Sequence, residues 1–148
     1  MALFMDSEKN FIKNIIKEVN VDIIQFHGME KDSFCSQFDK PFIKAVSYQN
    51  KELLLNLDQH YPNAYAFIVD SHQEGEMGGT GTTFQEKNLS FSSKKPILVA
   101  GGINSTNVIN VVKTYNPYGI DVSSGVESSK GIKSIKLIKE LVEIIKNE

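Results

Sequence analysis

Arginine is absent from this chain of 148 residues, and cysteine occurs once, at Cys35. Without arginine, the chain cannot hold a substrate carboxylate or phosphate through a bidentate guanidinium. A single cysteine excludes an internal disulfide framework and favours a reducing compartment, so we expect a cytoplasmic location. No apolar run approaches the roughly 18 residues that a membrane span needs, so we expect no membrane partner.

An excess of charge of one sign is lacking as well. The net charge is −2, which gives no electrostatic footprint for nucleic acid or an anionic membrane. The three histidines show no pair at ligand spacing, so we expect no metal site and no cofactor. With 41% hydrophobic and 23% charged residues, the chain is typical of a globular protein. We therefore predict one domain, residues 1–148.

Short apolar runs alternate with helical patterns along the chain. The predicted strands are Ala2–Met5, Asp22–Phe26, Pro41–Val46, Ala64–Val69, Pro96–Ala100 and Gly119–Val122. The predicted helices are Ser7–Val19, Lys31–Phe38, Asn50–Leu57, one starting within 104–106, Ile132–Ile145 and a short one from Phe84. This alternation predicts a parallel sheet with right-handed crossovers. Six strands fit either an open doubly wound sheet or an incomplete (β/α)8 barrel.

Small residues follow the last two predicted strands directly. Gly101 and Gly102 follow one strand, and Ser123, Ser124 and Gly125 follow the next. Small residues let the backbone approach a ligand closely, and exposed N–H groups and hydroxyls suit a phosphate. In a (β/α)8 barrel the phosphate usually sits on the loops after the last two strands. These five residues are the strongest candidates for a binding site.

Four polar residues near strand ends are further candidates. Asp70 ends a strand, where it would serve as a catalytic acid or simply cap a turn. Gln25 and His27 are two apart and therefore share one face of a strand, where they would line the pocket and contact substrate or simply hydrogen-bond within the barrel. Asp121 alternates with Gly119 and Ser123 and is predicted to face the same pocket. The lysines between Lys130 and Lys139 are predicted to form the solvated face of a helix.

Several motifs occur in one order along the chain: QFHG at 25–28, FIVDS at 67–71, GGTGTTF at 78–84, VAGGI at 99–103 and DVSSGVE at 121–127. Together they resemble the phosphoribosylanthranilate isomerase family of tryptophan biosynthesis, which has a (β/α)8 barrel. The resemblance implies an incomplete barrel of about six βα units and a phosphosugar substrate. It also implies an Amadori rearrangement of N-(5′-phosphoribosyl)anthranilate to 1-(2-carboxyphenylamino)-1-deoxyribulose 5-phosphate.

The resemblance also assigns roles to the candidate residues. Asp70 stands at the position of the general acid, and Gly79 lies in a loop that closes near the substrate. The substrate-binding residues that it implies are Gln25, His27, Gly79, Gly101, Gly102, Asp121, Ser123, Ser124 and Gly125.

This chain departs from the family pattern at its start. It resembles the family from the third strand onward, so the KICG-like strand with the cysteine base and the loop with a substrate-binding arginine have no counterpart. Cys35 is predicted to lie on a helix of the outer layer and is no replacement. Three interpretations stay open: a partial isomerase, a non-catalytic remnant or half of a split barrel that keeps the phosphate site, and another phosphosugar-barrel activity. We expect self-association or pairing with a separate N-terminal fragment.

Overall fold

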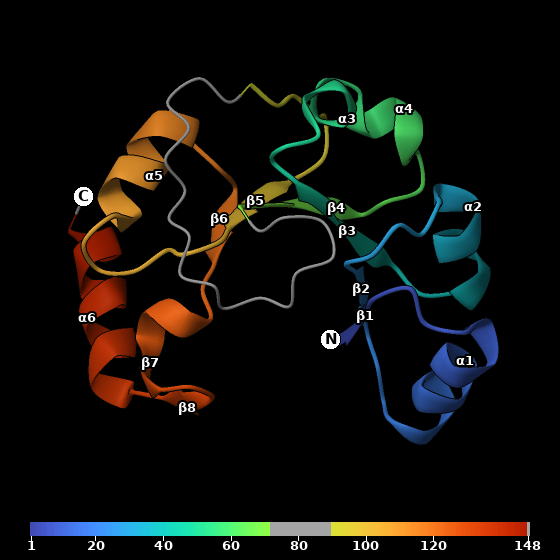
Figure 1. Cartoon of the computed structure of the whole chain (residues 1–148), viewed down its shortest axis with the longest axis horizontal. Helices are drawn as coiled ribbons and strands as arrows, with labels where there is room; N and C mark the ends of the chain where they lie inside the picture. The colour runs from blue at the N-terminus through green and yellow to red at the C-terminus, as the bar shows by residue number, and fades with distance from the viewer. Residues whose placement is uncertain (72–89, 148) are drawn as a thin grey trace.

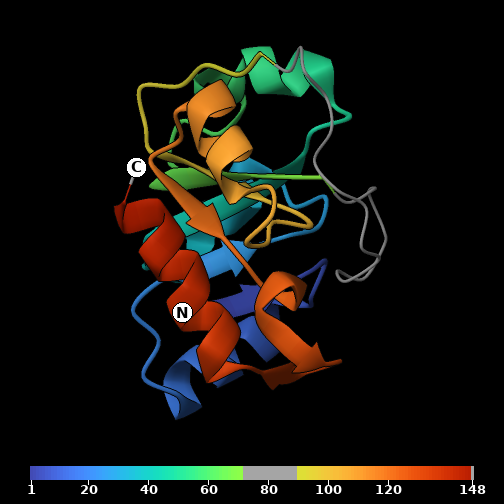
Figure 2. The ribbon, with the colours of Figure 1, turned by 90° about the vertical axis from the view of Figure 1, so that its left-hand side faces the viewer.

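Six parallel strands in chain order form the sheet of this protein. The structure is a computed structural model that describes residues 1–71 and 90–147. The strands are β1 (Ala2–Phe4), β2 (Ile24–Phe26), β3 (Phe42–Ser47), β4 (Ala66–Asp70), β5 (Ile97–Ala100) and β6 (Gly119–Asp121). Their order in the sheet is β1-β2-β3-β4-β5-β6, and Figure 2 shows β1 to β4 stacked with a common direction. A doubly wound sheet reverses its strand order at a switch point, so this uninterrupted order indicates an arc of a barrel.

The helices surround the outside of this arc (Figure 1). They are α1 (Lys9–Glu18), α2 (Asp32–Cys35), the 3₁₀ turn η1 (Ser36–Phe38), α3 (Lys51–Leu55), α4 (Leu57–His60), α5 (Val108–Tyr115) and α6 (Ile135–Lys146). After β6 the chain forms a further 3₁₀ turn, η2 (Ser124–Val126), and an antiparallel hairpin of β7 (Glu127–Ser129) and β8 (Ile132–Lys133). Because parallel crossovers are right-handed as a rule, strands added in one direction place their helices on one face.

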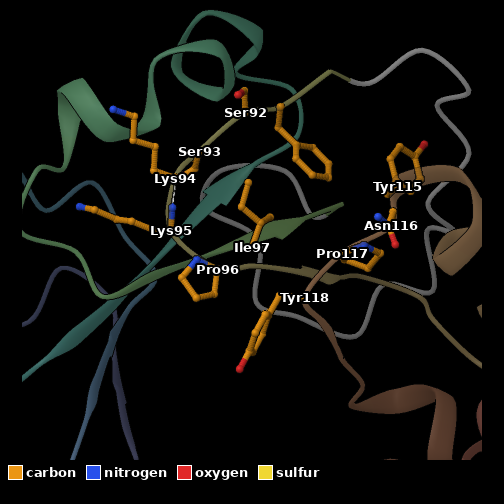
Figure 3. Close-up of a pocket in the computed structure, with 11 residues that line it drawn as sticks. Ser92, Ser93, Lys94, Lys95, Pro96, Ile97, Tyr115, Asn116, Pro117 and Tyr118 are labelled. Carbon is orange, nitrogen blue, oxygen red and sulfur yellow. Dashed lines mark hydrogen bonds between the residues drawn. The ribbon is translucent and has the colours of Figure 1, made fainter.

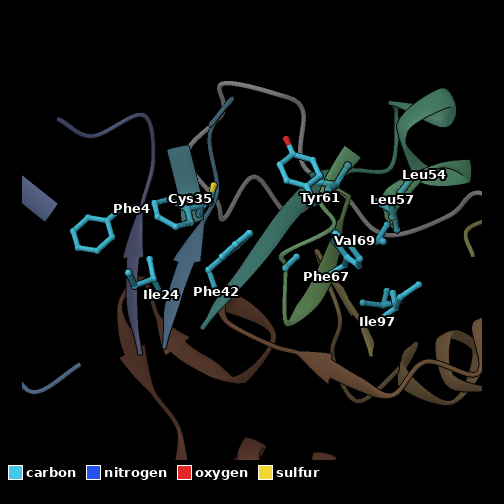
Figure 4. Close-up of a cluster of buried hydrophobic side chains, with 14 of the residues drawn as sticks. Phe4, Ile24, Cys35, Phe42, Leu54, Leu57, Tyr61, Phe67, Val69 and Ile97 are labelled. Atoms are coloured by element: carbon cyan, nitrogen blue, oxygen red, sulfur yellow. The ribbon is translucent and has the colours of Figure 1, made fainter. Parts of the chain in front are cut away.

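The central strands of the sheet are largely buried on both faces. The face toward the helices carries the main apolar core, which runs from β1 to β5 in Figure 4 and includes Phe4, Ile24, Phe42, Phe67, Val69 and Ile97. The opposite, concave face carries a second cluster of smaller side chains: Ile43, Ala45, Ile68, Leu98 and Ala100. Successive side chains in a strand point to opposite faces, so strands buried on both sides read as continuous apolar runs. This explains why the strands were visible in the sequence.

The final helix corrects the prediction from sequence. It begins at Ile135 rather than at Ile132, because residues 127–133 fold back as the β7–β8 hairpin. Gly131 allows the turn of this hairpin with a φ of 80°. Ser134 then takes an extended conformation, and its hydroxyl accepts a hydrogen bond from the Leu137 N–H at 3.3 Å. The helix therefore starts at a regular serine N-cap. The first helix also begins later than predicted, at Lys9.

Removing this cap is expected to destabilise the protein measurably. In Ser134→Ala the Leu137 N–H loses its side-chain acceptor, which costs about 0.5–2 kcal/mol of unfolding free energy. Ser134→Asp supplies another good N-cap acceptor and a favourable negative charge at the helix start, so it should unfold like the unaltered chain. Urea denaturation of the three proteins measures the difference. Equal midpoints for all three would show that the hydroxyl does not stabilise α6.

Exposed apolar side chains gather at the two ends of the arc. Leu3 on β1 is 57% exposed and Phe11 on α1 is 54% exposed, whereas Ile135 on α6 is 72% exposed. Within residues 1–71 and 90–147, the outer edges of β1 and β6 have no parallel strand beside them. Apolar side chains that a closed barrel would cover are therefore open to solvent at both edges. No helix in these described ranges is long and apolar enough to cross a membrane.

Candidate functional site

The strand register brings the predicted polar residues to one edge of the sheet. Ser47 lies opposite Asp70, Asp70 opposite Ala100, and Ala100 opposite Asp121. These four positions form one row across the carboxyl-terminal ends of β3 to β6. Paired residues of parallel strands point to the same face, so Asp70 and Asp121 both belong to the concave side. Two strand spacings separate their Cα atoms by roughly 10 Å.

His27 lies between Gln25 and Asp70. Its Nε2 atom lies 3.6 Å from Oδ2 of Asp70, and its Nδ1 atom lies 3.4 Å from Nε2 of Gln25. The His27 and Asp70 side chains are only 25% and 12% exposed. Gln25 and His27 thus lie side by side as predicted, and the structure adds that their neighbour is Asp70. An imidazole at this distance can interact electrostatically with a carboxylate.

Asp121 is electrostatically coupled to this pair. The surrounding protein atoms desolvate its carboxyl group and raise its pKa, and the negative charge of Asp70 raises it further. His27 and Lys133 act in the opposite direction. The side chain still has access to solvent because β6 lies at the edge of the arc. Burial and the charge of Asp70 therefore both favour the neutral form of Asp121.

Glycines let three loops pack closely beside these carboxylates. Gly101 has a φ of 96°, and a Cβ added to it would lie 1.8 Å from Oγ of Ser71. A Cβ added to Gly125 would lie 1.8 Å from the carbonyl oxygen of Ile103. The loop after β5 is therefore pressed between the loop after β4 and the loop after β6. Gly102, with a φ of 60°, continues the left-handed backbone.

Asparagine side chains brace the loop after β5. The Gly102 carbonyl accepts hydrogen bonds from Nδ2 of Asn107 at 2.9 Å and from Nδ2 of Asn104 at 3.3 Å. Oδ1 of Asn107 accepts from the Asn104 N–H at 2.9 Å. The residues predicted to start a helix thus form this turn, and α5 begins at Val108. These bonds fix the backbone at the predicted phosphate loop.

Lys133 binds the loop after β6, contrary to its predicted place on a solvated helix face. Its Nζ donates to the carbonyl oxygen of Ser123 at 2.8 Å and to Oγ of Ser123 at 3.1 Å, and it pairs with Oε1 of Glu127 at 2.7 Å. The hydrogen bond from Lys133 holds the pKa of Glu127 below its usual range. The hairpin, which sequence reasoning missed, therefore places a positive charge beside the Ser123–Gly125 loop. Ser123 and Ser124 are themselves exposed.

Cys35 lies on the helix side of the sheet rather than on its concave face. Its side chain is fully buried in the core between the sheet and the helices, in agreement with its predicted place in the outer layer (Figure 4). Burial raises the pKa of the Cys35 thiol to about 12. A buried neutral thiol is a poor base and nucleophile.

The folded chain is expected to resist thiol reagents. Since Cys35 is the single cysteine, the release of colour from a disulfide reagent at about pH 8 reports on this residue alone. We expect slow reaction in buffer and fast, stoichiometric reaction in denaturant. Since the folded pKa is raised, the neutral thiol stabilises the fold below the ordinary value of 9.0, and this contribution is lost as the pH rises toward 12. Fast stoichiometric reaction of the native chain would contradict this burial.

A hollow of about 660 Å³ lies at the other edge of the sheet, where β5 and β6 begin (Figure 3). Its lining residues are Phe91, Ser92, Ser93, Lys94, Lys95, Pro96, Ile97, Tyr115, Asn116, Pro117 and Tyr118. Nζ of Lys95 donates to the carbonyl oxygens of Tyr61 and Pro62. This lining carries no carboxylate or imidazole, so the acid–base groups belong to the opposite edge.

Gly79, the glycine-rich loop and the helix predicted from Phe84 lie outside the described residues. Within the ranges that are described, no group of three histidine, cysteine or acidic side chains could hold a metal ion.

The uninterrupted strand order, the outer helices and the polar carboxyl-terminal edge define an arc of a (β/α)8 barrel. Comparison with known proteins identifies its family. Residues 1–144 match the family model of N-(5′-phosphoribosyl)anthranilate (PRA) isomerase. A relative named N-(5′-phosphoribosyl)anthranilate isomerase from Hahella chejuensis is 38% identical over 148 residues, which are 100% of this chain and 70% of the relative.

Solved structures agree with this match. The phosphoribosyl anthranilate isomerase of Thermotoga maritima is similar with a TM-score of 0.79 and 25% identity over 99% of this chain and 72% of that one. A second phosphoribosyl anthranilate isomerase, in complex with reduced 1-(o-carboxyphenylamino)-1-deoxyribulose 5-phosphate, shares the fold with a TM-score of 0.73 and 24% identity over 99% and 70% of the two chains. The chain belongs to the N-(5′-phosphoribosyl)anthranilate isomerase family. It spans from 62% to 70% of the length of the relatives it matches first.

Proposed function

We propose that the residues at the carboxyl-terminal edge of the sheet supply the general acid and the phosphate site for the isomerisation of N-(5′-phosphoribosyl)anthranilate in tryptophan biosynthesis. The observation that carries the proposal is that His27 lies 3.6 Å from Asp70. Beside them, the loops after β5 and β6 are in contact because Gly125 has no side chain. An Amadori rearrangement adds a proton to one atom and removes a different proton from another atom, so it needs both an acid and a base. Asp70 is the proposed acid.

In the proposed reaction, Asp70 gives its proton to the ring oxygen of the ribose, and the C1–O bond breaks to leave an iminium. A base then takes the proton from C2, and the resulting enol tautomerises to the ketone. His27 lies next to Asp70 and would restore its proton or hold the substrate's hydroxyl groups. Asp121, across the row, would contact the sugar.

The phosphate of the substrate would lie on the loops after β5 and β6. Gly101, Gly102, Ser123, Ser124 and Gly125 would offer backbone N–H groups and hydroxyls, and Lys133 supports Ser123 with a positive charge. Gln25 would line the pocket beside His27, and Gly79 would close over the substrate.

The base is proposed to come from residues outside these 148. Cys35 is excluded because it is buried between sheet and helices with a raised pKa. The family's first two βα units, which carry its cysteine base, would correspond to the part of the relatives that this chain does not span. Beside β1 and β6, both free in the described ranges, two further strands would close the barrel.

The test compares the purified chain with and without those two units. We expect the chain alone to bind reduced 1-(o-carboxyphenylamino)-1-deoxyribulose 5-phosphate but not to turn over phosphoribosylanthranilate. Adding the two units from a relative, fused or in trans, should start turnover. Turnover by the chain alone would show that another group acts as the base. Failure to bind the analogue at all would favour the second candidate, a non-catalytic remnant, to which the open edges of β1 and β6 point.

We further expect the chain alone to self-associate through its open edges. Sedimentation should show dimers or larger species whose population rises with concentration. Leu3→Lys with Ile135→Lys, which puts charge on both exposed apolar ends, should shift the protein toward monomer. Asn10→Lys with Asn110→Lys adds the same charge at exposed helix positions and should not. A monomeric, cooperatively melting unaltered chain would contradict this expectation. The cytoplasmic location stays a prediction.

A further inference from the structure

Two buried charges lie behind His27, and the proposed reaction uses neither. Nζ of Lys44 on β3 lies 3.4 Å from Oε2 of Glu30, and their side chains are 2% and 3% exposed. Lys44 points from the sheet into the helix-side layer, where its ammonium also lies over the ring of Tyr61. Burial lowers the pKa of Lys44, and the charge of Glu30 counteracts this. The charge of Glu30 therefore offsets part of the effect that burial has on Lys44.

The ammonium of Lys44 hydrogen-bonds to the backbone on both sides of His27. It donates hydrogen bonds to the carbonyl oxygens of Phe26 at 3.3 Å and of Gly28 at 2.6 Å. A third bond, to the carbonyl oxygen of Ala45 at 3.0 Å, anchors it to its own strand. The residue that faces Asp70 is thus held between two carbonyl groups that share one donor.

Glu30 and Asp6 hold the backbone after His27 through further hydrogen bonds. The Glu30 carboxylate accepts from the Asp6 N–H at 2.7 Å and from the Gly28 N–H at 2.9 Å. Oδ1 of Asp6 accepts in turn from the Met29 N–H at 2.7 Å. A Cβ added to Gly28 would come within 2.4 Å of the Asp6 carboxyl group. The loops after β1 and β2 are therefore locked to each other and to β3.

A buried ion pair is weak support for stability, because the loss of hydration offsets much of the attraction. Its geometric effect is larger here, since five hydrogen bonds and the Lys44–Glu30 ion pair hold residues 26–30 around one imidazole. We infer that Lys44, Glu30 and Asp6 are positioning residues that hold the His27 ring against Asp70. The importance of this contact rests on the proposed function, but the contact itself can be measured without substrate.

The experiment uses the ring resonances of His27 in the ligand-free chain. Asp70→Asn should shift them, whereas those of the exposed His60 on α4 should stay in place as an internal control. In Lys44→Met with Glu30→Gln, which removes both charges together, the shift caused by Asp70→Asn should be lost. Lys95→Met is the matched control, because it removes another lysine that donates to two carbonyl groups, at the opposite edge of the sheet, and it should preserve the shift.

Asp6→Gly decides the question if the double variant fails to fold. Asp6 is exposed and has a φ of 48°, which glycine adopts freely, so this variant keeps the backbone conformation. It removes the bond to Met29 and the negative charge that Asp6 places near Lys44. It should also diminish the shift. An undiminished His27 response in the folded double variant, or in Asp6→Gly when the double variant does not fold, overturns the inference, as does a His27 that never responds to Asp70. Failure of the proposed function, seen as absent binding or turnover, would leave these resonances unaffected.

Discussion

Asp70→Asn is expected to lower isomerase turnover by about 10²- to 10⁴-fold, the usual contribution of a positioned general acid. The assay uses the chain joined to the family's first two βα units, so that a base is present. An asparagine keeps the size and polarity of the side chain but has no proton to give to the ring oxygen. The loss should therefore fall on kcat, while the affinity for reduced 1-(o-carboxyphenylamino)-1-deoxyribulose 5-phosphate changes little.

Asp22→Asn is the control for this change. Asp22 is an exposed residue just before β2, at the opposite edge of the sheet, so its substitution removes a carboxylate without touching the site. Its turnover should equal that of the unaltered protein. Full activity of Asp70→Asn would remove Asp70 from the role of acid and make His27 or Asp121 the next group to test.

Gly125→Ala is expected to weaken binding of the phosphorylated analogue by about tenfold or more, which corresponds to about 1.4 kcal/mol. The added methyl group would meet the backbone carbonyl of Ile103 at 1.8 Å, and backbone cannot swing aside as a flexible side chain does. The loop after β6 must then move away from the loop after β5. The N–H groups and hydroxyls that would hold one phosphate are separated. Titration calorimetry measures the change.

Gly119→Ala provides the matched comparison. It adds the same methyl group on β6, but that group meets only the side chain of Leu98 at 3.7 Å, an ordinary contact. Binding should be unchanged in this variant. If Gly125→Ala binds the analogue as well as Gly119→Ala does, the touching loops are not the phosphate site. Denaturation of both variants separates a loss of binding from a loss of folding.

The sequence predicted the strands and the edge at which the candidate residues meet, because both depend on local patterns. Apolar runs such as Ala66–Asp70 announce buried strands, and residues at their ends must meet at one edge of a parallel sheet. The approach of His27 to Asp70 was not predicted, since it depends on the curvature of the arc across β3.

Two features escaped sequence reasoning, for different reasons. Lys44 stands within the strand Phe42–Ser47, and nothing nearby in the sequence shows that its acceptors are Phe26, Gly28 and Glu30. Lys133 was placed on a helix because the apolar spacing from Ile132 onward continues the helical period. The Gly131 turn and the Ser134 cap override that period. Local periodicity thus fails where a cap or a buried charge fixes the backbone.

Strand pairing also fixes the spacing along the row formed by Ser47, Asp70, Ala100 and Asp121. Hydrogen bonding sets the interval between parallel strands, so the separation of the two carboxylates is two such intervals whatever the surrounding loops contain. Loops at this edge can therefore lengthen or change their side chains, and with them the ligand that they bind. The separation between the Asp70 and Asp121 positions stays the same. A deletion of one residue within β6 would have the opposite effect, because it would turn Asp121 to the helix-side face and leave only Asp70 on the concave face.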